Sequence, residues 1–175
     1  MVFWKKGYVE TSIDDLVEAT AVNRYGLYAE FGSKHGLFLA CLDYYQDNAV
    51  NEFFGVVEKP GASMPEIKSY FETVLNLYSQ PAGKLGCLMC NSATEVAPHD
   101  KAVANKVKGA LERLTKGFSS ALINAQKKGE VKKELEVAEA ADFLTGILLG
   151  ASVMVRSGAS KKMIGNTIHM SLASL

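Results

Sequence analysis

The chain has 175 residues, with 19 basic and 19 acidic side chains, so its formal net charge is zero. This length allows one large domain or two small ones, and 48% hydrophobic residues can fill a substantial core. The balanced charge excludes a protein whose overall field attracts nucleic acid, so any contact with DNA must depend on a local surface. Only four prolines, together with several long stretches of helical period, predict an all-α fold.

Three cysteines, an odd number, and a start without the layout of a signal peptide predict a reducing, cytoplasmic environment. No apolar run reaches the roughly 18 residues that a membrane-spanning helix needs. The longest apolar run, residues 143–155, therefore predicts a helix that is buried on several sides. We expect no membrane partner.

Residues 11–34 predict two short helices joined by a tight turn, followed by the start of a third. Ser12, or Thr11, can cap the first helix, whose apolar residues repeat at helical spacing. Asn23 can cap the second helix, and Ser33 can cap the third. Two short helices with such a turn form a helix-turn-helix, whose second helix is placed to enter the major groove of DNA.

The N-terminal residues of that second helix are the ones expected at the base edges. They are Asn23, Arg24 and Tyr25. Arginine can read guanine bidentately, asparagine can read adenine, and tyrosine can pack on a thymine methyl group or bond a phosphate. The pattern alone leaves open an ordinary helical hairpin within an all-helical core.

A family resemblance adds to this interpretation. The motifs that carry it run, in order, through Phe3-Trp4-Lys5-Lys6-Gly7-Tyr8, Thr11-Ser12-Ile13, Val22-Asn23-Arg24-Tyr25-Gly26-Leu27-Tyr28, Phe31-Gly32-Ser33-Lys34 and Gly36-Leu37-Phe38. This stretch resembles the DNA-binding domain of the TetR family of transcriptional repressors, and residues 86–100 resemble, more weakly, the ligand-domain signature of one TetR subgroup. The resemblance implies a homodimer that binds a double-stranded DNA operator and is released by a small-molecule effector. It also implies that bases face Asn23, Arg24 and Tyr25 and that phosphates are held by Thr11, Ser12, Tyr28 and Lys34.

The resemblance predicts a helix-turn-helix domain over residues 1–36 and a helical ligand-binding and dimerisation domain over 37–175, with about nine helices in all. The chain departs from the family pattern in a first helix shortened to residues 2–6, and in Ala21, where a turn glycine is common. The first 36 residues also carry four basic against five acidic side chains, a net charge of −1. These features leave a second hypothesis, a helical ligand-binding or thiol-sensing module with weak or vestigial DNA binding.

The remaining helices are expected over residues 34–57, 63–80, 87–96, 100–128, 137–157 and 161–175. The helix over 34–57 would link the DNA-binding part to the remainder. An effector cavity would be lined by apolar or aromatic residues on inward helix faces, although any one of them can be plain core. The candidates are Cys41, Tyr45, Phe71, Leu75, Tyr78, Cys87, Asn91, Phe118 and Phe143.

The two C-terminal helices are expected to form the dimer interface. Residues 143–155 are apolar nearly all round, and a small chain cannot easily surround such a helix. We therefore predict a four-helix bundle with a second copy of the chain, the alternative being that both helices are interior. The predicted interface residues are Gly146, Leu149, Gly150, Val153, Ile164, Ile168 and Leu172.

Cys87 and Cys90 form a Cys-x-x-Cys pair. No second pair or nearby histidine accompanies it, so we predict neither a metal site nor a cofactor. The pair is either two small core residues or a thiol sensor of oxidants or electrophiles, which would need a lowered thiolate pKa. Because no catalytic constellation is present either, we do not expect an enzyme.

Overall fold

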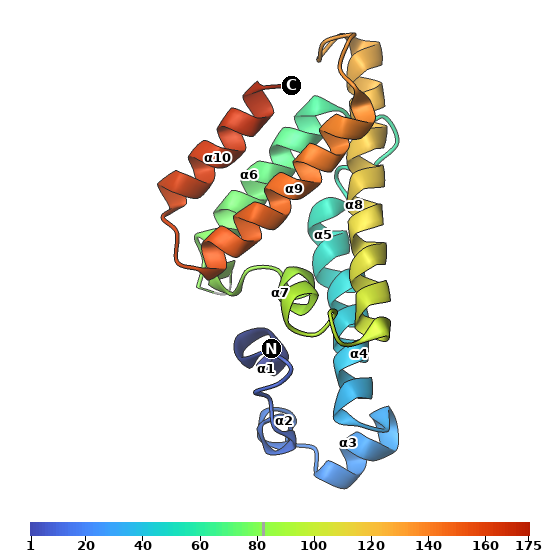
Figure 1. The fold of residues 1–175 in the computed structure, drawn as a ribbon, viewed down its shortest axis with the longest axis vertical. Helices are drawn as coiled ribbons and strands as arrows, with labels where there is room; N and C mark the ends of the chain where they lie inside the picture. The colour runs from blue at the N-terminus through green and yellow to red at the C-terminus, as the bar shows by residue number, and fades with distance from the viewer. Residues whose placement is uncertain (82) are drawn as a thin grey trace. The chain divides into compact units, whose positions relative to one another are not determined.

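The computed structural model describes residues 1–81 and 83–175 (Figure 1). These residues contain α-helices, one π-helical turn, one 3-10 turn and no strand, which confirms the predicted all-α fold. The α-helices are α1 (Val2–Lys6), α2 (Ile13–Thr20), α3 (Arg24–Phe31), α4 (Lys34–Tyr45), α5 (Asn51–Phe54), α6 (Met64–Tyr78), α7 (Leu88–Glu95), α8 (Lys101–Lys128), α9 (Val137–Arg156) and α10 (Lys161–Ala173). The π-helical turn is η1 (Gln46–Val50), and the 3-10 turn is η2 (Gly83–Leu85).

The helix expected over residues 34–57 is interrupted by the π-helical turn. The chain leaves the α-helical geometry of α4 after Tyr45, passes through η1 and resumes as α5 at Asn51. Short π-helical insertions of this kind keep a helix continuous while changing its hydrogen-bond register. Counted as one helical stretch, α4, η1 and α5 leave nine helices in the described chain, as predicted.

Side-chain caps start helices α2, α3 and α4. Ser12 Oγ accepts a hydrogen bond from the Asp15 N–H at 3.1 Å, and the Asp15 carboxylate accepts one from the Ser12 N–H at 2.9 Å. Asn23 Oδ1 accepts from the Gly26 N–H at 2.8 Å, and Ser33 Oγ accepts from an N–H in the first turn of α4. Each cap satisfies an amide that the helix itself leaves free, so these three starts follow from local sequence.

The described chain divides into two compact units. The first contains residues 1–49 and 87–108, and the second contains residues 50–86 and 109–175. The first unit thus adds α4, α7 and the first part of α8 to the three N-terminal helices. The predicted functional boundary at residue 36 is a different kind of division and stays a prediction.

The core of the first unit holds the short helix α1 in place. Phe3 is buried, and its ring lies 5.1 Å from that of Phe38, centroid to centroid. The Tyr8 ring lies 4.8 Å from the same Phe38 ring. Leu16 of α2 and Leu27 of α3 are also buried in this unit. One aromatic side chain therefore anchors a helix of only five residues.

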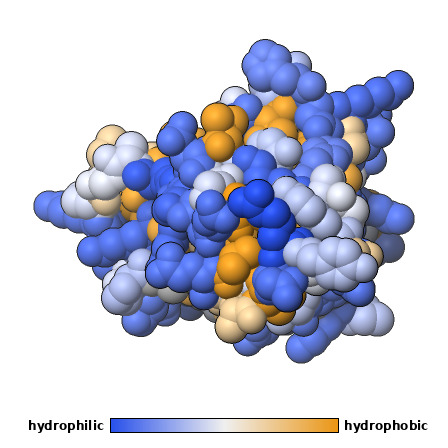
Figure 2. Space-filling view, turned by 90° about the horizontal axis from the view of Figure 1, so that it is seen from below, coloured by the Kyte–Doolittle hydropathy of each residue, from blue (hydrophilic) through white to orange (hydrophobic). Residues whose placement is uncertain are grey.

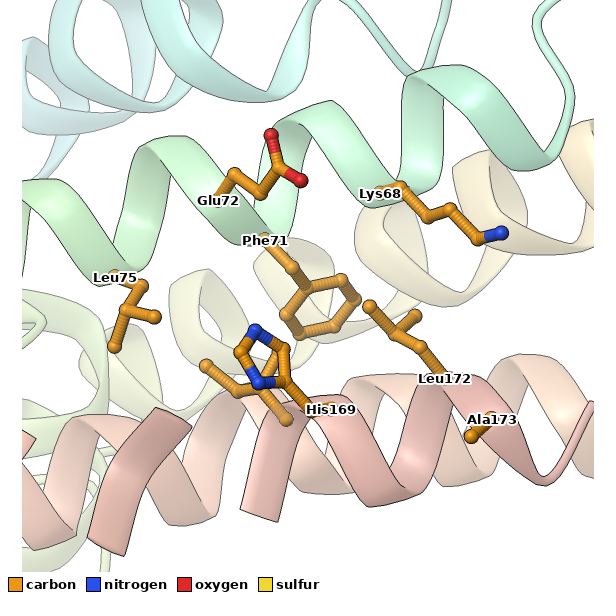
Figure 3. Close-up of a pocket in the computed structure, with 8 residues that line it drawn as sticks. Lys68, Phe71, Glu72, Leu75, His169, Leu172 and Ala173 are labelled. Atoms are coloured by element: carbon orange, nitrogen blue, oxygen red, sulfur yellow. The ribbon is translucent and has the colours of Figure 1, made fainter. Parts of the chain in front are cut away.

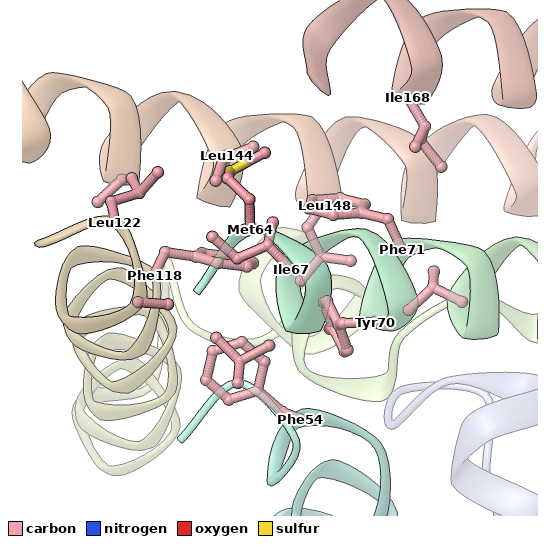
Figure 4. Close-up of a cluster of buried hydrophobic side chains, with 14 of the residues drawn as sticks. Phe54, Met64, Ile67, Tyr70, Phe71, Phe118, Leu122, Leu144, Leu148 and Ile168 are labelled. Atoms are coloured by element: carbon pink, nitrogen blue, oxygen red, sulfur yellow. The ribbon is translucent and has the colours of Figure 1, made fainter. Parts of the chain in front are cut away.

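The core of the second unit is built by α5, α6, α8, α9 and α10 (Figure 4). The rings of Phe71 and Phe118 stack at 5.8 Å, and Phe54 meets Phe118 edge-on at 5.2 Å. A side chain at Gly117 would lie 2.6 Å from the Phe54 ring, so the absence of a Cβ atom there lets α8 accept that ring. Aromatic pairs of this kind add stability beyond the area they bury.

Helix α9 is, within the described chain, the one helix long and apolar enough to cross a membrane by length and composition alone. The same properties are typical of the core helix of a globular protein. Leu144 and Ala151 of α9 are fully buried in the second unit, and α10 packs against α9 and α6 (Figure 1). The packing therefore favours the core interpretation.

Candidate DNA-binding head and effector site

The helix-turn-helix is formed by α2 and α3, and we call helices α1–α3 with the start of α4 the head. Leu27 anchors α3 with an exposure of only 4%, whereas Tyr25 is 84% exposed and Tyr28 is 41% exposed. Asn23 and Arg24, at the start of α3, are also exposed. The face seen from below in Figure 2 is mainly hydrophilic, with several separate apolar patches. The predicted base-reading residues therefore point away from the core of the head.

Arg24 is already paired with an acidic side chain in this structure. Its Nη2 lies 2.9 Å from Asp14 Oδ1, and both side chains are more than half exposed to solvent. An exposed pair of this kind contributes at most about 1 kcal/mol and is screened by salt. The predicted contact of Arg24 with DNA would require this side chain to leave the Asp14 carboxylate.

The turn of the helix-turn-helix contains a strained residue. Ala21 has φ 57° and ψ 15°, the left-handed conformation that glycine adopts without a steric penalty. Glycine is common at this position in the TetR pattern that the N-terminal residues resemble, and the left-handed backbone of Ala21 shows why it is favoured. The remaining residues with positive φ in the described chain are glycines.

Two residues predicted to hold phosphate have structural contacts instead. Thr11 is 1% exposed, and its Oγ1 donates a hydrogen bond to the Gly7 carbonyl at 2.5 Å. Lys34 Nζ donates to the carbonyls of Tyr8 and Thr11 at 2.9 and 2.8 Å and lies 4.5 Å from the centre of the Tyr8 ring. Both residues close the turn between α1 and α2, a role that the sequence analysis missed. Ser12, by contrast, remains exposed.

The structure also shows two long-range contacts to the head that local sequence patterns did not reveal. Glu95, at the end of α7, accepts a hydrogen bond from the Val9 N–H at 2.8 Å. His35 Nε2 lies 2.6 Å from Asp100 Oδ2, and the same carboxylate caps α8. The Val103 N–H, and to a lesser extent His35, lower the pKa of Asp100 below its usual value.

The nine predicted effector residues do not share one compact unit. Four of them belong to the first unit: Cys41, Tyr45, Cys87 and Asn91. Of those in the second unit, Phe118 is fully buried in the core, whereas Phe143 is 43% exposed on α9. The prediction that Phe143 lines a cavity is not supported, because its neighbour Leu144 occupies the inward face of the helix.

Leu75 borders two surface grooves of the second unit, next to α6 and α10. The first groove has a volume of about 240 Å³ and also contains Phe71 (Figure 3). The second has a volume of about 390 Å³ and combines apolar residues with Tyr78 and two lysines. Its lining residues are Leu75, Tyr78, Ser79, Lys84, Val155, Gly158, Ala159, Lys161 and Ile164.

The predicted interface residues also fall into two groups. Gly146, Gly150 and Val153 are exposed on α9, and Leu149 and Leu172 are half-buried. Ile164 and Ile168, by contrast, are each 2% exposed and belong to the core of their own subunit. They were selected as the most apolar residues of α10, and that property reflects core packing. The exposed large apolar residues of α10 are Met163 and Met170.

Comparison with known proteins shows the family to which this chain belongs. The family model described as "Bacterial regulatory proteins, tetR family" matches residues 1–41, and the model "Tetracyclin repressor-like, C-terminal domain" matches residues 63–170. The chain belongs to the TetR family. The predicted family, the helix-turn-helix domain and the function of a DNA-binding transcriptional regulator are thereby confirmed.

Similar proteins cover nearly the whole chain. The HTH-type transcriptional repressor ComR of Escherichia coli is 35% identical, over 97% of this TetR-family chain and 83% of ComR. The uncharacterized regulator YezE of Bacillus subtilis is 27% identical, over 99% of this chain and 90% of its own length.

Solved structures of TetR-family regulators share the fold. A cysteine mutant of the regulator CifR, complexed with 26-bp double-strand operator DNA, superimposes with a TM-score of 0.86 at 23% identity, covering 98% of this chain and 90% of CifR. The reduced form of Escherichia coli NemR gives a TM-score of 0.84 at 19% identity, covering 97% and 88%. At these identities the likeness concerns the fold.

Proposed function

We propose that this TetR-family protein is a cytoplasmic repressor that binds a double-stranded operator as a homodimer and is released by a small-molecule effector. The observation that carries the proposal is the start of α3, where Arg24 and Tyr25 project into solvent while Leu27 anchors the helix. Two such helices read successive major grooves when they lie about 34–36 Å apart. An effector that prefers a different spacing lowers DNA affinity by reciprocal coupling. We assign the protein no enzymatic activity.

Within the head, we propose that Arg24 reads guanine and that Tyr25 contacts a thymine methyl group or a phosphate. Tyr28 and Ser12 are exposed and remain candidates for phosphate contacts. Asn23 already uses its side-chain oxygen as a helix cap, so we propose that its amide NH₂ group faces the DNA. The net charge of −1 over the first 36 residues makes the few exposed cations decisive for affinity.

The Arg24–Asp14 pair gives the sharpest test. Arg24→Ala should weaken binding to the DNA upstream of the protein's own gene by about 1–3 kcal/mol. Asp14→Asn should strengthen binding, because it removes a charge that repels phosphate and frees Arg24 from its ion pair. Fluorescence anisotropy titrations at one stated salt concentration measure both effects, and Lys133→Ala, which removes a cation outside the head, is the control. Equal affinity of all four proteins would reject the assignment.

For the effector we propose the larger groove, with Leu75 and Tyr78 on its apolar side and Lys84 and Lys161 at its edge. This combination suits a small molecule with an apolar body and an anionic group. The Tyr78 hydroxyl is held in place by a 2.6 Å hydrogen bond with Ser152. A few fixed polar groups in a largely apolar groove can set the orientation of a ligand.

The dye 1-anilinonaphthalene-8-sulfonate, which combines apolar aromatic rings with an anionic sulfonate group, tests this groove. Lys161→Ala should weaken dye binding several-fold, since it removes a cation that faces the groove. Lys162→Ala, which removes an exposed lysine that does not line the groove, should leave the affinity unchanged. Equal loss in both variants would show general attraction to charge, and no loss in either would place the dye elsewhere.

A further inference from the structure

The two cysteines of the Cys-x-x-Cys pair lie at the start of α7. Cys87 occupies the N-cap position and Cys90 the third position of the helix, so their side chains share one turn. Both are half-buried, and none of the three cysteines, all of which lie in the described residues, is in a disulfide. This position favours a reactive pair over two plain core residues. The N-terminus of a helix stabilises negative charge such as that of a thiolate, and partial exposure gives a reagent access to the sulfur.

Polar groups converge on the Cys87 sulfur. The Cys90 side chain, the Cys90 N–H, the Tyr45 hydroxyl and the Met89 N–H favour its thiolate and lower the pKa of Cys87 to about 6, although burial opposes them. For Cys41, in the same compact unit, burial raises the thiol pKa. The first unit thus contains one cysteine whose thiol pKa is lowered, Cys87, and one whose thiol pKa is raised, Cys41.

The pair is also connected to the head. Tyr45, which contacts Cys87, packs edge-on against Trp4 of α1 with ring centroids 5.2 Å apart. The opposite end of α7 holds Glu95, which accepts the hydrogen bond from the Val9 N–H just before α2. A change at the start of α7 therefore has two physical routes to the helices of the head, one through aromatic packing and one through a hydrogen bond.

We propose that Cys87 and Cys90 are a reversible dithiol–disulfide site for oxidants of the hydroperoxide class, and that its oxidation alters the head. The thiol chemistry does not depend on the proposed function, whereas its effect on DNA binding rests on the proposed repressor function. The Cys87 thiolate attacks one peroxide oxygen, the O–O bond breaks, and hydroxide or an alkoxide leaves as Cys87 becomes a sulfenic acid. The Cys90 sulfur then attacks the Cys87 sulfur, the S–S bond forms, the S–O bond breaks, and water leaves with the Cys90 proton.

The disulfide removes the thiolate that the Tyr45 hydroxyl and the α7 amides stabilise. The two thiols have given two electrons to the peroxide, and the neutral disulfide sulfur that remains at Cys87 is a weak hydrogen-bond acceptor. Tyr45 must therefore find another partner, and the first turn of α7 must adjust. Both Trp4 and the Glu95–Val9 hydrogen bond lie along these paths.

The first test is chemical and needs no DNA. After exposure of the full-length protein to hydrogen peroxide, alkylation and peptide mass spectrometry should find the number of free thiols reduced from three to one, with Cys41 still free. Dithiothreitol should restore all three. Cys90→Ser should stop at a Cys87 sulfenic acid that dimedone traps. Three thiols that remain alkylatable, or a Cys41 that oxidises as fast as Cys87, would overturn the proposal.

A second test separates a positioned thiol from an incidental one. Tyr45→Phe removes only the hydroxyl, and it should slow alkylation of Cys87 at neutral pH by about threefold to tenfold because the thiolate fraction falls. Tyr44→Phe is the matched control, since Tyr44 is 71% exposed on the same helix. Equal rates in both variants would contradict the assigned role of Tyr45.

The third test concerns the head. Oxidised protein should bind the DNA upstream of its gene about tenfold more weakly, with recovery after dithiothreitol, and Cys87→Ser should not respond to peroxide. The fluorescence of Trp4, the only tryptophan, should change with the same time course. A disulfide that forms without either change would overturn the coupling. If the reduced protein binds no DNA, the repressor proposal fails, whereas the thiol chemistry is decided by the first test.

Discussion

Ala21 is the residue whose local conformation conflicts most clearly with its identity. A left-handed φ costs a residue with a Cβ atom roughly 1–2 kcal/mol, and here it belongs to the turn between α2 and α3, the two helices of the helix-turn-helix. The N–H of Ala21 donates to the Val17 carbonyl at 2.9 Å, so the conformation is part of the end of α2. The turn is therefore maintained by its neighbours against the preference of the residue.

Ala21→Gly should stabilise the protein by about 1 kcal/mol, the relief of strain less the added freedom of the unfolded chain. Urea denaturation followed by circular dichroism measures this difference in the free energy of unfolding. The matched control is Ala19→Gly, two residues earlier on an exposed position within α2, which should destabilise by about 0.5–1 kcal/mol. Loss of stability in both variants would show that position 21 carries no strain.

At the scale of elements, helix starts were predictable and helix faces were only partly so. Ser12, Asn23 and Ser33 cap the expected helices because a cap acts within four residues. Which apolar side of a helix faces its own core is decided by partners far away in sequence, so Ile168 was assigned to the wrong surface. The contact between Glu95 and Val9 has no local signal at all.

Helix α2 gives a prediction on acidity. Asp15 bonds Lys6 and the backbone and side chain of Ser12, and these contacts lower its pKa from 3.8 to about 2. A depressed folded-state pKa contributes stability above the unfolded value of 3.8, and this is lost as the pH falls through about 2. The urea midpoint of the wild type should therefore exceed that of Asp15→Asn at neutral pH, with the gap shrinking below pH 4. A gap independent of pH would contradict this origin.

At the scale of the whole molecule, the exposed apolar surface of α9 and α10 remains to be covered. Phe143, Gly146, Gly150 and Val153 recur at helical spacing on α9. Apart from the adjoining backbone of α9 itself, no described atom lies within 4 Å of a Cβ placed on either glycine. Met170, on α10, is 73% exposed. Exposed apolar stripes on two antiparallel neighbours are what a four-helix bundle with a second copy would bury. The same pairing would supply the second recognition helix that operator binding needs.

Val153→Asp should convert the dimer into a monomer, because a carboxylate buried at the centre of an apolar interface loses its hydration without gaining a partner. Sedimentation equilibrium at micromolar concentration measures the change, and operator affinity should fall with it. Ile123→Asp is the control, since Ile123 is an exposed apolar residue of α8, outside the predicted interface. A wild-type protein that is already monomeric would refute the interface, and with it the simultaneous reading of two major grooves. Since one head presents so little positive charge, its affinity for DNA depends on this duplication more than on any single contact.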